Sequence, residues 1–133
     1  MRNYIIKNAI IVNEGRKMNG DVLIKDGRID KIGTSIETPN GVTEINAEGM
    51  YLIPGAIDDQ VHFREPGLTH KASIYTESKA AVAGGVTSFM EMPNTVPPVF
   101  NQTLMEDKYQ IGAQNALANY SFFMGTSQDN WED

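Results

Sequence analysis

Residues 57–67 read IDDQVHFREPG, and the architecture of the chain is inferred outward from them. An apolar, β-prone run leads into this segment, which then places Asp58, Gln60, His62 and Arg64 at every second position. Alternate side chains of an extended strand share one face, so these four polar groups are predicted to lie together. A strand that ends in converging polar groups, followed by a helix, is typical of the catalytic mouth of a β/α barrel.

Apolar residues occupy the positions between the four polar ones, and the segments that follow are predicted to alternate between helix and strand. Val61 and Phe63 are predicted to point away from the polar face, toward a core. The segments that follow alternate in type, which is the order of a parallel α/β sheet. They are a helix over 73–83 ended by Gly84-Gly85, a strand over 86–92, a helix from Asn101 or Thr103 to about 117, and a strand over 120–124.

Short β-branched runs separated by turn signals fill the first third of the chain. They predict a small β-sandwich or meander over residues 1–51, with the α/β part over 52–133. Asp21 and its neighbouring acidic residues are interpreted as turn formers and solvated positions. The predicted strands cover 3–12, 21–25, 28–32 and 42–45, with turns at Asn19-Gly20, Asp26-Gly27 and Asn40-Gly41.

Composition narrows the function classes. The net charge of −6 argues against a nucleic-acid surface, and the absence of cysteine excludes disulfides and thiolate sites. The apolar run at the N-terminus is too short and too interrupted for a signal peptide or a membrane span. The chain is therefore expected to be cytoplasmic, with neither nucleic acid nor membrane as a partner.

Two motifs resemble one enzyme family. Asp58-x-Gln60-x-His62 is similar to the Asp-x-His-x-His pattern on the first barrel strand of the amidohydrolase superfamily, with Gln60 where the first histidine stands. The continuation Phe-Arg-Glu-Pro-Gly resembles the dihydroorotase version of this motif. Residues 92–95, Met-Pro-Asn-Thr, match a second dihydroorotase motif about one βα unit later. The resemblance extends over the whole chain.

The resemblance implies a fold and an activity. The fold is a TIM-type (β/α)8 barrel beside a small β-sandwich segment, and such a barrel needs roughly 250 residues. At 133 residues the chain is expected to be an N-terminal portion with the first three barrel strands and two helices, inactive by itself. The implied activity is metal-assisted, reversible hydrolysis of dihydroorotate to N-carbamoyl-aspartate in pyrimidine biosynthesis.

The resemblance also assigns roles to residues. Arg64 and Asn94, with His62, are implied to bind substrate, Arg64 through a two-point grip on its carboxylate. His62 and Gln60 are implied to hold the divalent metal, zinc in this family, and Asp58 to support the site from behind. The general base and the other ligands belong to later strands. Plainer interpretations stay open: an ion pair of Arg64 with a nearby carboxylate, a turn role for Asn94, and a backbone hydrogen bond for Asp58.

Two alternative functions stay open beside dihydroorotase. One is a non-catalytic, dihydroorotase-like assembly subunit, a partner of aspartate carbamoyltransferase or of a second copy, which the Gln60 replacement favours. The other is a cyclic amidohydrolase of the hydantoinase or allantoinase type, against which Arg64 and Asn94 speak.

Overall fold

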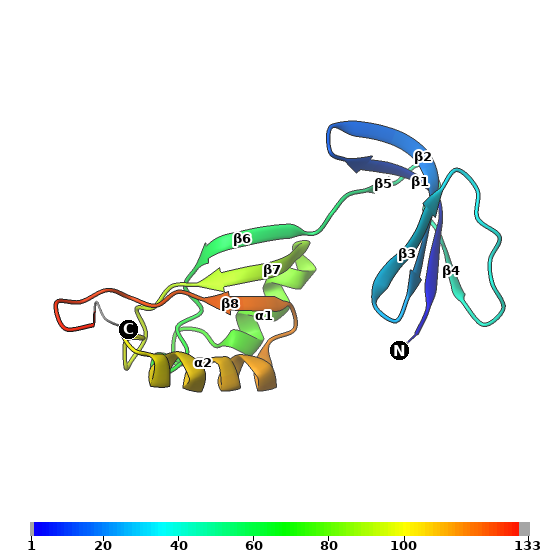
Figure 1. Cartoon of the computed structure of the whole chain (residues 1–133). Helices are drawn as coiled ribbons and strands as arrows, with labels where there is room; N and C mark the ends of the chain where they lie inside the picture. Colours follow the sequence, from blue (N-terminus) through cyan, green and yellow to red (C-terminus); the bar gives the residue numbers. More distant parts are fainter. Residues whose placement is uncertain (1, 131–133) are drawn as a thin grey trace. The chain divides into compact units, whose positions relative to one another are not determined.

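The computed structural model describes residues 2–130, which form two compact units divided in sequence between Pro54 and Gly55 (Figure 1). Each unit is built around a β-sheet of its own, and only the second unit contains helices. The mixed α/β class predicted from the sequence is confirmed. The elements are β1 Tyr4–Asn13, β2 Arg16–Lys25, β3 Arg28–Gly33, β4 Thr43–Asn46, β5 Tyr51–Leu52, β6 Ala56–Val61, α1 Ile74–Ala83, β7 Val86–Glu91, α2 Gln102–Asn115 and β8 Asn119–Phe122.

The first unit is a sheet of five strands in the order β3-β2-β1-β4, with β5 also paired to β1. Antiparallel hairpins join β1 to β2 and β2 to β3, whereas β4 and β5 run parallel to β1. The hairpin turns lie at Glu14-Gly15 and Asp26-Gly27, whose positive φ angles of 49°, 71°, 49° and 76° suit tight turns between twisted strands.

The turn predicted at Asn19-Gly20 is wrong, because these residues lie inside β2. Gly20 is needed there for close packing instead. A Cβ at this position would lie 2.6 Å from the backbone oxygen of Gly33 on the neighbouring strand. The glycine of this Asn-Gly pair is thus present because the backbones of β2 and β3 approach closely, and not because the chain turns. The local sequence does not distinguish these two uses of glycine.

Asp21 is buried, not solvated as predicted. Its carboxylate accepts hydrogen bonds from Lys7 Nζ at 2.6 Å and from the backbone N–H groups of Asn8 and Ile36 at 2.9 and 2.8 Å. The hydrogen bond from Lys7 is the main reason why the pKa of Asp21 lies below its ordinary value. One carboxylate thus joins β1, β2 and the loop that follows β3.

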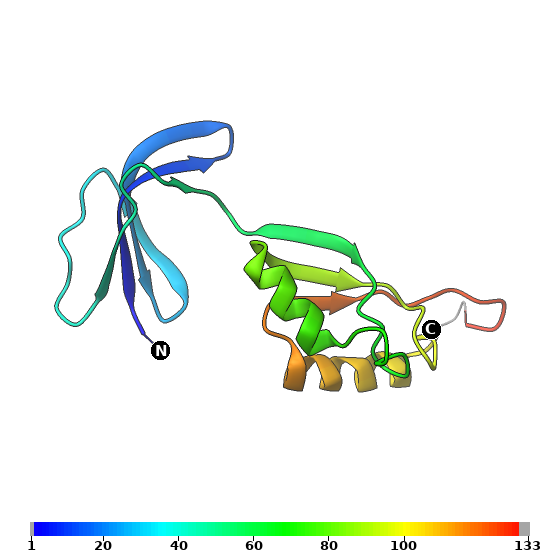
Figure 2. The same cartoon turned by 180° about the vertical axis from the view of Figure 1, so that it is seen from behind.

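The second unit is a parallel sheet in the order β6-β7-β8, and both helices cover the same face of it (Figures 1 and 2). Ser73 and Asn101 cap the two helices through side-chain oxygens that accept from Thr76 N–H and Leu104 N–H, respectively. Between helices and sheet lies a core of mainly aromatic residues, in which Phe63 and Val61 take part as predicted. Its buried members are Phe63, Ile74, Phe89 and Phe122.

Candidate functional site

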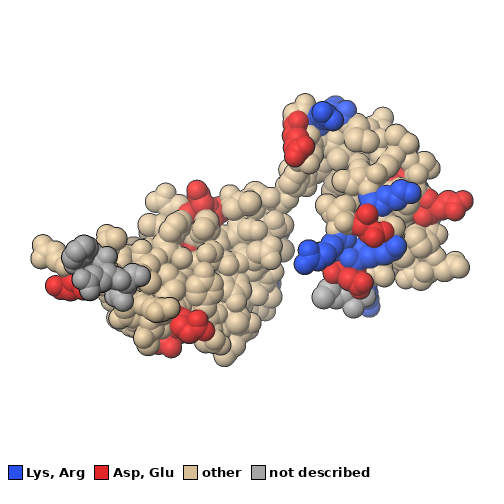
Figure 3. Space-filling view, in the orientation of Figure 1, with Lys and Arg blue, Asp and Glu red and all other residues tan. Residues whose placement is uncertain are grey.

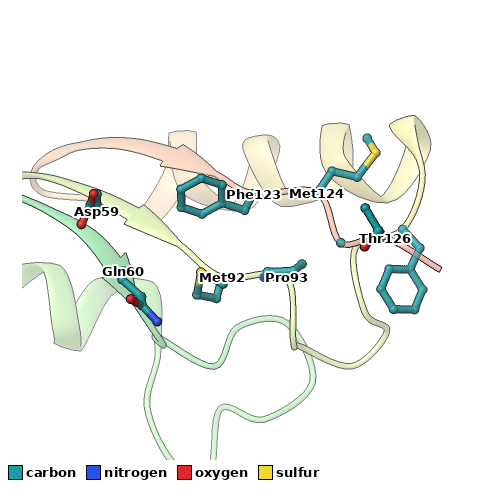
Figure 4. Close-up of a pocket in the computed structure, with 9 residues that line it drawn as sticks. Asp59, Gln60, Met92, Pro93, Phe123, Met124 and Thr126 are labelled. Carbon is teal, nitrogen blue, oxygen red and sulfur yellow. The ribbon is translucent and has the colours of Figure 1, made fainter. Parts of the chain in front are cut away.

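The carboxyl ends of β6, β7 and β8 meet at one edge of the sheet, because the three strands are parallel. An open hollow of about 590 Å³ lies at this edge. Figure 4 shows Asp59 and Gln60 from the end of β6, with mainly apolar side chains and Thr126 contributed by the segments after β7 and β8. The lining residues are Asp59, Gln60, Met92, Pro93, Phe100, Phe123, Met124, Gly125 and Thr126.

The end of β6 departs from the strict alternation predicted for it. The pairing of β6 with β7 shifts register between Asp58 and Val61, and β6 ends at Val61. As a result Asp59 and Gln60, which are neighbours in sequence, both line the hollow. An irregularity of this kind re-aims side chains at a sheet edge, and it depends on the partner strand rather than on the local sequence.

Past the strand ends, His62 and Asn94 meet. His62 Nδ1 lies 2.9 Å from Asn94 Oδ1, although 32 positions separate the two residues in sequence. Since an amide oxygen only accepts, Nδ1 donates in this contact, which leaves Nε2 for a different partner. The contact joins the first motif to the second, as expected for two strand ends at one edge.

The two loops that hold these residues interlock. We call them the rim: residues 62–67 after β6 and 92–97 after β7. Met92 N–H donates to Val61 O at 3.0 Å, and Val96 N–H donates to Pro66 O at 3.1 Å. Gly67 has φ +80°, and a Cβ there would lie 2.0 Å from Val96 O. The glycine that ends the first motif is therefore required by the approach of the second loop.

Arg64 has an unusual backbone conformation, with φ +70°, in the left-handed region that non-glycine residues avoid. Its N–H donates to Glu91 Oε1 at 2.9 Å. Within residues 2–130 its guanidinium takes part in no ion pair, so the structure contains no Arg64–Glu65 or Arg64–Asp58 pair. Glu65 instead accepts the N–H of Ile74 at 2.8 Å, at the start of α1.

Asp58 forms a hydrogen bond within its own segment, and His70 is exposed to solvent. Asp58 Oδ1 accepts the N–H of Gln60 at 3.2 Å, which is the plainer of the two roles considered for this aspartate. His70 lies exposed in the turns before α1.

A buried ion pair, which the sequence analysis did not identify, lies behind the rim. Glu91 at the end of β7 and Lys108 on α2 have side chains that are 1% and 0% exposed, with Lys108 Nζ 3.2 Å from Glu91 Oε2. Lys108 Nζ also donates to Met92 O at 3.2 Å. The signal was present: Lys108 lies four residues after Leu104 and four before Gly112, on the apolar stripe of the helix.

Burial opposes the charge on both members of this pair. It raises the pKa of Glu91 and lowers the pKa of Lys108, and in each case the charge of the partner acts in the opposite direction. Desolvated charges are tolerated only where partners compensate for the lost hydration. Oε1 of Glu91 accepts the backbone N–H of Arg64, whereas Oε2 has the ammonium group as an ion-pair partner but accepts no hydrogen bond from the described residues.

The described residues supply only part of the ligand set that the metal predicted from the resemblance would need. Across residues 2–130 no three His, Cys, Asp or Glu side chains are grouped closely enough to hold a metal ion. His62 by itself is suited to be a ligand, since its Nδ1 proton is engaged by Asn94, as the outer nitrogen of a metal-bound histidine usually is. Gln60 adds only an amide oxygen, a weak donor to zinc.

Surface charge and the composition of the helices bear on two kinds of partner, nucleic acid and membrane. On the face drawn in Figure 3, the charged side chains visible over the Gly55–Asp133 unit are acidic. That face offers no basic patch for a phosphate backbone among the residues described. Neither helix of the described chain is long and apolar enough to cross a membrane.

Known proteins resemble the chain over most of its length. The family model described as Dihydro-orotase-like matches residues 49–121. A dihydroorotase of Methanosarcina acetivorans is 35% identical over 96% of this chain and 27% of its own length. An allantoinase of Deinococcus radiodurans is 34% identical over 96% of this chain and 29% of its own length.

The structural comparison agrees with the sequence comparison. The L-hydantoinase (dihydropyrimidinase) of Arthrobacter aurescens matches with a TM-score of 0.91 and 27% identity, covering 98% of this chain and 29% of that one. The chain thus spans between a quarter and a third of the length of these relatives.

Proposed function

The chain belongs to the dihydroorotase-like family of amidohydrolases, and on that premise we propose that it supplies part of the active site of an enzyme that hydrolyses dihydroorotate. The reaction adds water across a ring amide to give N-carbamoyl-aspartate, and it is reversible. The observation that supports this most is the contact of His62 Nδ1 with Asn94 Oδ1 at 2.9 Å, which brings the two motifs to one rim.

Arg64 is the residue we assign to the substrate carboxylate. Dihydroorotate carries one carboxylate, and a guanidinium binds such a group through two parallel hydrogen bonds. Arg64 is half-buried on the same loop as His62, and within residues 2–130 no carboxylate is paired with its guanidinium. We assign Asn94 and His62 to the substrate beside it, and Asp58 to supporting the end of β6.

The second unit, on this proposal, is the start of a (β/α)8 barrel. Its strand-helix-strand order and its single covered sheet face both suit that fold. Ile57 on β6 is 72% exposed, which suits a strand that packs against further parts of a barrel. The general base and further metal ligands of the family are assigned to elements outside residues 2–130.

Among the described residues we assign metal binding to His62, with Gln60 two positions earlier as a weaker candidate. The divalent metal of the family, zinc, activates a water molecule when it is bound. His62 would offer Nε2, and at least two further protein ligands would be needed from outside the described residues. No step assigned to Arg64 or Asn94 depends on that metal.

Two other functions have specific support. The allantoinase relative and the hydantoinase structure favour a cyclic amidohydrolase with a different ring. Gln60 favours a non-catalytic subunit that assembles with aspartate carbamoyltransferase or with a second copy. Arg64 and Asn94 favour dihydroorotate, because uncharged hydantoins offer no carboxylate to the guanidinium.

The experiment measures turnover by the natural protein that contains residues 1–133. We expect dihydroorotate to be hydrolysed in preference to hydantoin and allantoin. Arg64→Ala should raise KM for dihydroorotate roughly 30-fold to several hundredfold, the loss expected for one partner of a desolvated charge pair. Lys71→Ala, at an exposed position in the loop before α1, is the control. Preference for hydantoin or allantoin, or no turnover at all, would contradict the proposal.

A further inference from the structure

The buried pair of Glu91 and Lys108 has no role in the function proposed so far. It lies between β7 and α2, with both side chains almost fully excluded from solvent. An apolar pair of similar size usually stabilises a core as well as a buried ion pair does, since each charge loses several kcal/mol of hydration. The position of this pair, rather than its stability, therefore needs an explanation.

The pair is connected to both loops of the rim. Glu91 uses Oε2 for the Lys108 ammonium and Oε1 for the N–H of Arg64, at 3.2 and 2.9 Å. Lys108 reaches Met92 O, the first residue of the second loop, at 3.2 Å. A single buried pair thus contacts the backbone on either side of the place where His62 and Asn94 meet.

The hydrogen bond from Arg64 N–H to Glu91 is made at a residue whose backbone conformation is unfavourable. The left-handed conformation of Arg64, with φ +70°, costs roughly 1–2 kcal/mol for a residue with a Cβ. Such a conformation persists when the surroundings hold it. The hydrogen bond from Arg64 N–H to Glu91 and the one from Leu68 N–H to Arg64 O, at 3.0 Å, are the contacts that hold it.

We propose that Glu91, kept in place by Lys108, is a positioning residue that holds the Arg64 backbone in this conformation and so aims its guanidinium at the substrate carboxylate. This inference rests on the proposed function, because it takes Arg64 to be the carboxylate-binding residue. Glu91 touches no substrate on this view and acts only through Arg64. The acceptor oxygen, rather than the charge, is the property that matters.

Two double variants of the natural protein separate the acceptor from the charge. Glu91→Gln/Lys108→Met removes both charges and keeps a side-chain oxygen for Arg64 N–H. Glu91→Leu/Lys108→Met removes both charges and the oxygen. Both lose the contact of Lys108 with Met92, so that loss cancels in the comparison. The exposed pair Lys25–Asp30, 3.0 Å apart, supplies the control variant Lys25→Met/Asp30→Asn.

Two measurements are made on each variant. The first is hydrogen–deuterium exchange of the peptide that contains Arg64, which needs no substrate. The second is the steady-state kinetics with dihydroorotate. We expect the leucine variant to exchange at Arg64 about tenfold faster than the glutamine variant, and its KM to rise about tenfold with kcat little changed, as for a buried N–H group that loses its hydrogen-bond acceptor. The glutamine variant and the surface control should resemble the wild type.

Equal exchange at Arg64 and equal KM in the two double variants would overturn the inference, because a purely structural pair would affect both alike. If the leucine variant does not fold, the wild type decides: an unprotected Arg64 amide overturns the inference and a protected one supports it. The two measurements distinguish failure of the proposed function from failure of this inference. If the natural protein does not hydrolyse dihydroorotate, but exchange at Arg64 still depends on the side-chain oxygen of residue 91, the substrate assignment is wrong and the positioning role is retained.

Discussion

Replacing Gly67 by alanine tests whether the two loops of the rim pack as closely as the structure has them. Gly67 has φ +80°, and an added Cβ would lie 2.0 Å from Val96 O and 2.8 Å from Val96 C. Both neighbours are backbone atoms, so relief requires the second loop to move. That movement would strain the hydrogen bond from Val96 N–H to Pro66 O.

The expected loss has two parts. The left-handed backbone costs an alanine roughly 1–2 kcal/mol, and forcing a methyl group into a packed site costs about 1–3 kcal/mol more. Gly85 separates the two, since it has φ +89° in the same unit and nothing within 4 Å of an added Cβ. Gly85→Ala should therefore show the backbone cost alone.

Urea unfolding followed by far-ultraviolet circular dichroism measures both variants. With a slope on the order of 1 kcal/mol per molar urea, Gly85→Ala should lower the midpoint by about 1–2 M and Gly67→Ala by about 1–3 M more. Equal midpoints for the two variants would refute the close packing of the rim. A wild-type-like midpoint for both would refute the assigned backbone conformations as well.

Three further predictions concern the charged and polar side chains. Asp21→Asn should lower the free energy of unfolding of the first unit by about 3 kcal/mol, measured by urea unfolding, because it breaks the buried pair with Lys7. Because the pKa of Asp21 is lowered in the folded state, the wild type has this stabilisation at pH values above the ordinary pKa of 3.8. It loses the stabilisation as the pH falls through the folded-state pKa. The free energy of unfolding of the variant should therefore lack this part of the decrease at acid pH. Lys108→Ala should destabilise the second unit by roughly 3–5 kcal/mol in thermal unfolding, since it leaves Glu91 buried without its ion-pair partner; a loss no larger than that of Glu91→Gln/Lys108→Met would count against this. Gln60→His should raise the metal content of the natural protein, measured by mass spectrometry of the metal, and unchanged stoichiometry would exclude residue 60 from metal binding.

The sequence was sufficient for the elements of the second unit. The helix predicted to begin at Ser73 has Ser73 as its N-cap, Asn101 rather than Thr103 caps the second helix, and the strand predicted over 86–92 ends one residue earlier, at Glu91. The meeting of His62 with Asn94 also follows from sequence, because each comes just after a strand and parallel strands end at one edge. These features depend on local periodicity, capping and strand direction, which neighbouring residues determine.

Other features depend on contacts between segments distant in sequence. Gly20 was mistaken for a turn because its partner, Gly33, lies on another strand. Asp21 was interpreted as solvated because Lys7 and Ile36 approach it only in the folded sheet. A local pattern contains no information about which strand or loop will be its neighbour.

The same distinction applies at the candidate site. Local patterns place two polar motifs at the ends of two parallel strands, with a guanidinium, an imidazole and a carboxamide among them. The register shift of β6 before its end, and the hydrogen bond from Arg64 N–H to Glu91 with Lys108 paired to that carboxylate, emerge only in the folded chain. The burial of a charge and the conformation of a loop are set by packing across β6, β7 and α2, whereas residue order sets only which groups are available to pack.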